Sequence, residues 1–276
     1  MDLARQAIEI LRANDRGGYT VPTATGLYPA QWNWDSCLVA LGLAQFDEPR
    51  AVVEIETLLG GQWPDGMVPH ILFHGDDSTY FPNTSVWQAG PTRRSSGITQ
   101  PLVAATGDVA GASEVATMEQ KTEAAIARCW HEEDGFFYGV DTRTSMMIRK
   151  PGIAGLLPLF ADAAVAARHP RLVQRLESWL ARVAYSVPSF EPGRTEFEPQ
   201  RYWRGPVWLI MNWMLIDGLR RNGRAKLAAR IRQDSVALVE RTGFAEYFNP
   251  LTGEPLGGSA FSWTAAMYLH LGAESE

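Results

Sequence analysis

Apolar residues recur at α-helical spacing along most of this 276-residue chain, and the segments between them are irregular loops rich in Gly, Pro and aromatic residues. Strand signals are short: residues 131–144 predict only a turn and a small hairpin. Neither a parallel sheet nor a dinucleotide-binding glycine motif is indicated. We therefore predict an all-α fold, a toroid of helix hairpins with its site on the loops of one rim. The expected helices cover residues 2–14, 35–45, 49–59, 113–130, 152–167, 171–183, part of 202–219, 224–240 and 262–271.

Aromatic residues are frequent on the predicted loops. The chain contains ten Trp, eight Tyr and eleven Phe, and several Trp have polar neighbours, among them Trp32, Trp34, Trp63, Trp87 and Trp203. Rings with one polar edge suit a wet cleft that binds sugars, although large aromatic residues are also ordinary core material. The composition leaves both interpretations open.

Charge and cysteine content narrow the class of partner. A net charge of −6 without a basic stripe argues against nucleic acid as a ligand. The two cysteines lack metal-ligand spacing and lie in apolar helical patterns, which favours free thiols in a reducing compartment. The first residues predict an amphipathic helix, not a signal peptide, and no apolar run is long enough to span a membrane. We expect a cytoplasmic protein with no membrane partner.

The stretch 243–266 opens with an isolated acid, Glu246, close to Phe244, Tyr247 and Phe248. Turn-forming residues follow at 249–253, then two glycines at 257–258, then an apolar helix. A carboxyl group beside aromatic rings on a loop held by a helix is typical of catalytic or sugar-binding acids. The alternative is an exposed acid on a surface loop.

Six motifs, in order along the chain, resemble glycoside hydrolase family 63, and more narrowly its bacterial mannosylglycerate/glucosylglycerate hydrolase branch. The motifs are LYPAQWNWDS (27–36), GGQWPDGMVPHILF (60–73), YFP (80–82), SGITQP (96–101), RYWRGPVW (201–208) and FAEYFNPLTGEPLG (244–257) with SWTAA (262–266). The resemblance implies a single (α/α)6-barrel domain over residues 1–276. It also implies inverting hydrolysis of an α-glycosidic bond in a small sugar substrate, without metal or cofactor.

Inverting hydrolysis needs two carboxyl groups, one that protonates the leaving oxygen and one that activates water. The resemblance assigns the base to Glu246. The family's acid is an Asp in a WESGMDNSPRW-like motif, and the corresponding segment here, residues 102–126, contains no such motif. We therefore expect a contracted or incomplete barrel. The alternative to an enzyme is a carbohydrate-binding pseudoenzyme that has lost its general acid.

Asp35 matches an acid of the family's sugar pocket and is the first candidate for a replacement proton donor; alternatively, Asp35 or Ser36 simply caps a helix. The resemblance also implies substrate contacts, for which core packing is the alternative in the case of the aromatic residues and a structural salt bridge in the case of Arg204. The residues concerned are Tyr28, Trp32, Trp34, Gln62, Trp63, Tyr80, Gln100, Tyr202, Trp203 and Arg204.

Other polar residues are expected to be structural. His70 and His74 are four residues apart, but Pro69 disfavours the helix that a metal site of this spacing needs. Glu254 and Asp141 lack supporting context. If helices are missing from the barrel, apolar surface is left exposed, which favours a homo-oligomer.

Overall fold

The computed structural model describes residues 2–90, 94–98, 124–141, 143–160 and 169–273. Helices make up most of the regular structure, and the strands occur in four short pairs. Contacts group the chain into two compact units, the first comprising Met1–Ala105, Thr242–Glu246 and Gly257–Glu276, the second Thr106–Arg241 and Tyr247–Leu256. That both belong to one domain stays a prediction.

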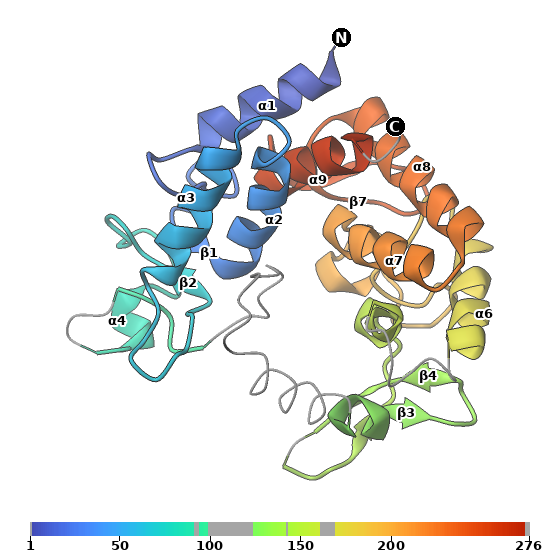
Figure 1. Ribbon diagram of the computed structural model, residues 1–276. Coiled ribbons are helices and arrows are strands. Elements are labelled where there is room, and N and C mark those ends of the chain that lie inside the picture. Colours follow the sequence, from blue (N-terminus) through green and yellow to red (C-terminus); the bar gives the residue numbers. More distant parts are fainter. Residues whose placement is uncertain (1, 91–93, 99–123, 142, 161–168, 274–276) are drawn as a thin grey trace. The chain divides into compact units, whose positions relative to one another are not determined.

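The first unit is built around helix α2 (Asn33–Leu43), which contacts α1 (Leu3–Asn14), α3 (Glu48–Leu59) and α9 (Ser262–Ala273) (Figure 1). Almost every residue of α2 is buried, as expected for a helix that is apolar on all sides. Two short strands, β1 (Gln31–Trp32) and β2 (Ile71–Leu72), pair antiparallel, and the short helix α4 (Thr84–Trp87) follows. The start of α2 is therefore fixed at a strand pair and enclosed by helices.

Helices α1 and α3 begin at acidic caps, whereas α2 does not. Asp2 and Asp47 each accept a hydrogen bond from a backbone N–H in the first turn of their helix. The prediction that Asp35 or Ser36 caps α2 is wrong, because the helix begins at Asn33 and both side chains lie inside its first turns. The carbonyl of His70 instead accepts the Asn33 N–H, so pairing with the β2 segment replaces a side-chain cap.

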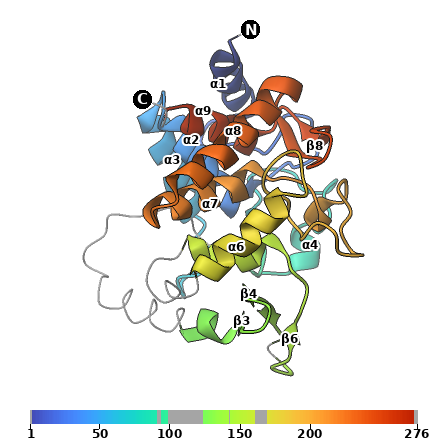
Figure 2. The ribbon, with the colours of Figure 1, turned by 90° about the vertical axis from the view of Figure 1, so that its right-hand side faces the viewer.

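The second unit centres on a 3₁₀ helix, η1 (Ile153–Leu159), which contacts α6 (His169–Leu180), α7 (Leu209–Arg221) and β4 (Phe136–Phe137). β4 pairs with β3 (Trp130–His131) next to α6 (Figures 1 and 2). The remaining elements of this unit are β5 (Gly139–Val140), β6 (Met147–Ile148), η3 (Tyr202–Arg204) and α8 (Ala225–Thr242).

Several predicted elements take a different form. The hairpin expected at 131–144 is two ribbons, β3–β4 and β5–β6. The expected helix at 152–167 is 3₁₀ over its described part, where Pro158 has no N–H to donate and Gly155 packs directly against Phe136 and the Phe137 carbonyl. Residues 124–130 of the helix expected at 113–130 are described: 124–128 are helical, but Cys129 lies in a turn and Trp130 begins β3, so the predicted end of this helix is wrong.

The segment around Glu246 is a strand, β7 (Ala245–Phe248), and not a loop as expected. It pairs with β8 (Pro255–Ser259), and the connecting turn closes with a hydrogen bond from the Gly253 N–H to the Asn249 carbonyl. The chain passes from the first unit to the second within β7 and returns at β8. No helix in the described part of the chain has the length and apolar character required to cross a membrane.

The contact between α2 and α9 depends on Gly42, because a Cβ there would lie 2.4 Å from both Cα and Cβ of Ala266. We predict that Gly42→Ala lowers the free energy of unfolding by about 1–3 kcal/mol through overpacking. Gly272→Ala is the matched control in α9, where a Cβ meets nothing within 4 Å. Denaturant titration of the three proteins measures the difference, and equal stability of the two variants would contradict the close approach.

Candidate active site

Glu246 is buried in β7, with 3% of its surface exposed, and its backbone is attached to the first turn of α9. The indole N–H of Trp263 donates to the Glu246 carbonyl at 3.0 Å, and the Thr264 hydroxyl donates to the Ala245 carbonyl at 2.6 Å. These two side chains hold the strand in place, so the position of the acid follows from the packing of α9.

Both oxygens of the Glu246 carboxylate accept hydrogen bonds. The Tyr28 hydroxyl donates to Oε1 at 3.1 Å, and the Gly258 N–H of β8 donates to Oε2 at 2.9 Å. Burial raises the pKa of Glu246, and these two donors oppose the rise because they stabilise the ionised form. A carboxylate in this state is suited to accept a proton from water near neutral pH.

Asp35 lies in the first turn of α2, and its carboxyl group lacks the pair of hydrogen-bond donors that Glu246 has. It is buried, and its Oδ1 has no hydrogen-bond partner among the described residues. Burial raises the pKa of Asp35 to about 8, and the negative charges of Glu246 and Glu54 contribute to the rise. A pKa of about 8 favours the protonated form of Asp35 at neutral pH. The contribution of the Glu246 charge indicates that the two carboxyl groups are near each other; that they form one catalytic site stays a prediction.

Aromatic rings surround these two acids in the first unit. Tyr28 meets Trp32 edge to face at 5.5 Å between ring centroids, and Trp32 meets Tyr80 in the same way at 5.5 Å. Tyr80 is near Asp35, since burial and the Asp35 charge both raise the pKa of its phenol. Trp32 also belongs to a hydrophobic cluster with Ile71 and other residues, so it has a core role as well as a place beside the acids.

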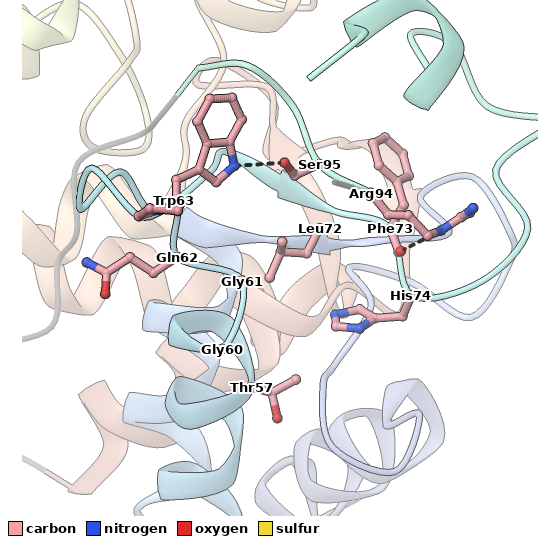
Figure 3. Close-up of a pocket in the computed structure, with 11 residues that line it drawn as sticks. Thr57, Gly60, Gly61, Gln62, Trp63, Leu72, Phe73, His74, Arg94 and Ser95 are labelled. Carbon is pink, nitrogen blue, oxygen red and sulfur yellow. Dashed lines mark hydrogen bonds between the residues drawn. The ribbon is translucent and has the colours of Figure 1, made fainter. Parts of the chain in front are cut away.

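Gln62 and Trp63 line a cavity of about 490 Å³ in the first unit (Figure 3). The Trp63 indole N–H donates to Ser95 Oγ at 3.1 Å, and Gln62 donates to the carbonyl of Gly66. Other residues of the lining are Thr57, Gly60, Gly61, Pro64, Leu72, Phe73, His74, Arg94 and Ser95, and neither acid of the candidate site is among them. A substrate contact by Gln62 or Trp63 stays a prediction.

Trp34 lies in the first turn of α2 and is half-buried. Gln100 is outside the described residues. The positions of these two side chains relative to Glu246 therefore stay predictions.

Tyr202, Trp203 and Arg204 form η3 in the second unit, and their convergence with Glu246 likewise stays a prediction. Trp203 stacks on the buried Trp208 ring at 4.2 Å between centroids. Arg204 Nη2 pairs with Glu198 Oε1 at 2.9 Å, but both side chains are partly exposed, so this is a surface salt bridge and the substrate contact of Arg204 stays a prediction.

Of the residues expected to be structural, His74, Asp141 and Glu254 have local partners, whereas the buried Nδ1 of His70 has no hydrogen-bond partner among the described residues. His74 Nε2 lies 2.7 Å from Gln31 Oε1, and its ring stacks on Tyr19. Asp141 accepts backbone N–H bonds two and three residues along the chain, and Glu254 accepts a bond from Gln200. Within the described residues no cluster of three His, Cys, Asp or Glu side chains could hold a metal ion.

Two features of the site were not expected from the sequence. The sequence predicts only flexible backbone at Gly258, and the resemblance implies a sugar contact for Tyr28, not a hydrogen bond to Glu246. The paired glycines at 257–258 were the available signal, because Gly257 adopts a φ of +73° that favours glycine. The neighbouring N–H is thereby aimed at the acid.

Comparisons with known proteins show which family the chain is similar to. The sequence model described as "Mannosylglycerate hydrolase MGH1-like glycoside hydrolase domain" matches residues 28–108 and 104–264. Mannosylglycerate hydrolase MGH1 of Selaginella moellendorffii is 32% identical over 96% of this chain and 85% of its own, and a mannosylglycerate hydrolase of Thermus thermophilus is 30% identical over 96% and 99%. The crystal structure of a family 63 mannosylglycerate hydrolase from Thermus thermophilus with Tris and D-glycerate superposes with a TM-score of 0.85, at 30% identity, over 97% of this chain and 99% of that one.

The chain belongs to the MGH1-like glycoside hydrolase family. The predicted fold class, an all-α six-hairpin glycosidase of family 63, is confirmed. The two alignments extend over 415 and 411 positions, more than the 276 residues here, so the relatives contain residues without a counterpart in this chain. The family match breaks at residues 104–108, at the start of the segment in which the expected acid motif is missing.

Replacing Asp35 by Asn tests the buried acid through stability. Because the folded-state pKa of about 8 lies above the ordinary value of 3.8, the folded protein keeps a proton that the unfolded chain loses between these pH values. The wild type should therefore lose stability as pH rises from about 4 to about 8, at up to about 1.4 kcal/mol per unit, and the variant should not lose this contribution. We therefore expect the Tm of Asp35→Asn minus that of the wild type to increase as pH rises from about 4 to about 8. Above about pH 8 this difference should be constant. Thermal unfolding across this range measures the offset, and an offset independent of pH would contradict the raised pKa.

Proposed function

We propose that this chain hydrolyses the α-glycosidic bond of a small glycoside by inversion, with Glu246 as the base and Asp35 as the proton donor. The observation that supports this proposal most directly is a pair of buried carboxyl groups with different local environments. Glu246 has a hydrogen-bond donor on each oxygen, whereas the pKa of Asp35 is raised to about 8 by burial. Titratable groups whose surroundings favour opposite protonation states are suited to act as base and acid.

In the proposed reaction the Glu246 carboxylate takes a proton from water while the water oxygen bonds to the anomeric carbon. The bond from that carbon to the leaving oxygen breaks, and Asp35 gives its proton to this oxygen. A glycerate glycoside is the proposed substrate, since the named relatives are mannosylglycerate hydrolases. The proposed sugar contacts are the ten residues predicted from the resemblance, which include Trp32, Tyr80 and Trp203. Arg204 could bind the glycerate carboxylate only by exchanging its Glu198 partner.

A second candidate is a sugar-binding protein without turnover. It is favoured by the absence of the acid motif and by the break in the family match at residues 104–108. Losing a general acid costs about 10²–10⁴-fold in rate on a substrate with a poor leaving group. An activated aryl glycoside needs little protonation, so it separates the two candidates.

We predict that the wild type cleaves both mannosylglycerate and an aryl α-mannoside, and that Glu246→Gln lowers both rates by about 10²–10⁴-fold. Asp35→Asn should lower the rate on mannosylglycerate by a similar factor and change the aryl reaction much less, because only the first needs the proton. The glycerate reaction of the wild type should fall above about pH 8, where Asp35 ionises. Initial rates and NMR detection of the first anomer released measure rate and inversion.

Glu254→Gln is the matched control, an acid-to-amide change at an exposed residue bonded to Gln200. Equal losses on both substrates in Asp35→Asn would assign this residue to sugar binding. If the wild type cleaves neither substrate but still binds sugar in calorimetry, the proposed hydrolase is wrong and the second candidate, a sugar-binding protein, is supported. Glucosylglycerate, tested in parallel, identifies the sugar.

A further inference from the structure

The Tyr28 side chain reaches the acid of β7 from the loop before β1. Its hydroxyl donates to Glu246 Oε1 at 3.1 Å. Its ring packs edge to face against Trp32, at 5.5 Å between ring centroids, and against Phe261, at 5.9 Å. These contacts restrict the ring, so the direction of the hydroxyl is set by packing and does not depend on the hydrogen bond alone.

The bond to Tyr28 leaves the carboxylate able to act on water. Each carboxylate oxygen has two acceptor positions. Tyr28 occupies one on Oε1 and the Gly258 N–H occupies one on Oε2. The carboxylate plane is therefore held from both oxygens, while acceptor positions remain for the proton of a water molecule.

Few titratable groups face Glu246 in the part of the chain that the structure describes. They are the Tyr28 phenol and the Asp35 carboxyl of α2; the contacts from β8 and α9 come from a backbone N–H and an indole. No Lys or Arg is among the groups that alter the pKa of Glu246. Tyr28 is thus the side chain that offsets the cost of burying this charge.

We propose that Tyr28 is a positioning residue for the base: its hydroxyl orients the Glu246 carboxylate and keeps it ionised. This role differs from the sugar contact predicted for Tyr28 from the sequence, because it acts through Glu246 and is present without substrate. Its catalytic consequence rests on the proposed function; its effect on the carboxylate does not.

Tyr28→Phe removes the hydroxyl and keeps the ring with its two aromatic contacts. Because a hydrogen bond to the ionised form is lost, the pKa of Glu246 should rise by about one unit. The acidic limb of kcat/KM on the aryl glycoside should move up by the same amount, so the rate on this limb falls about tenfold, while KM changes little. Tyr138→Phe is the matched control, since that hydroxyl donates to Asp134 at 2.8 Å in the second unit.

The ¹³C carboxyl resonance of Glu246, assigned by its loss in Glu246→Gln, reports the same pKa without turnover. A raised pKa in Tyr28→Phe, absent from the Tyr138 control, supports the proposal. If the wild type cleaves no glycoside but the resonance shifts as expected, the proposed function fails and the role of Tyr28 toward the carboxylate stands. If the wild type is active and neither the resonance nor the acidic limb moves, Tyr28 is only packing and the proposal is overturned.

A second modified protein keeps the proposal testable if Tyr28→Phe does not fold. Replacing the tyrosines by 3-fluorotyrosine makes every phenol a stronger donor and keeps each ring, so the pKa of Glu246 should move downward. An unchanged or raised pKa in this protein would overturn the proposal.

Discussion

The constraint on which the first unit depends is the burial of a carboxylate. Removing an ion from water costs several kcal/mol unless hydrogen bonds replace the lost solvation. For Glu246 these bonds come from two distant segments, the Tyr28 hydroxyl and the Gly258 N–H. The partner strand β8 supplies the Gly258 N–H, so the pairing of β7 with β8 brings one of these two donors to Glu246.

Helix packing then fixes where the two acids lie. Asn14 at the end of α1 donates to Ser262 at the start of α9, and the next two residues of α9 hold the backbone of β7. Asp35 is carried by α2, which packs on α9 with Gly42 directly against Ala266. One helix pair therefore determines the separation of the base from the second acid. A site built on packed helices holds its geometry better than one built on loops.

Helical periodicity predicted most of the helices, because a 3.6-residue repeat of apolar side chains survives in the sequence whichever neighbours cover it. It failed at residues 153–159, where Pro158 and the close packing of Gly155 favour a 3₁₀ helix. The resemblance predicts Glu246 and Asp35 as the two acids, but it could not show that the Gly258 N–H binds Glu246. That contact is a backbone property of a strand pair: the glycines at 257–258 signal the unusual backbone, but not which group its N–H binds. Likewise, the cap of α2 comes from the His70 carbonyl, a partner far along the chain.

The two acids also influence each other during the proposed reaction. The negative charge of Glu246 is one cause of the raised pKa of Asp35, so Asp35 holds its proton most firmly while the base is ionised. When Glu246 takes a proton from water, this repulsion disappears and the pKa of Asp35 falls. The donor thus becomes more acidic at the moment when the leaving oxygen needs its proton. Such coupling requires a site with few other charges, because a nearby cation would hold the pKa of Asp35 low throughout the cycle. The groups that set the pKa of Asp35 are burial, its own backbone N–H and the acids Glu246 and Glu54, with no cation among them.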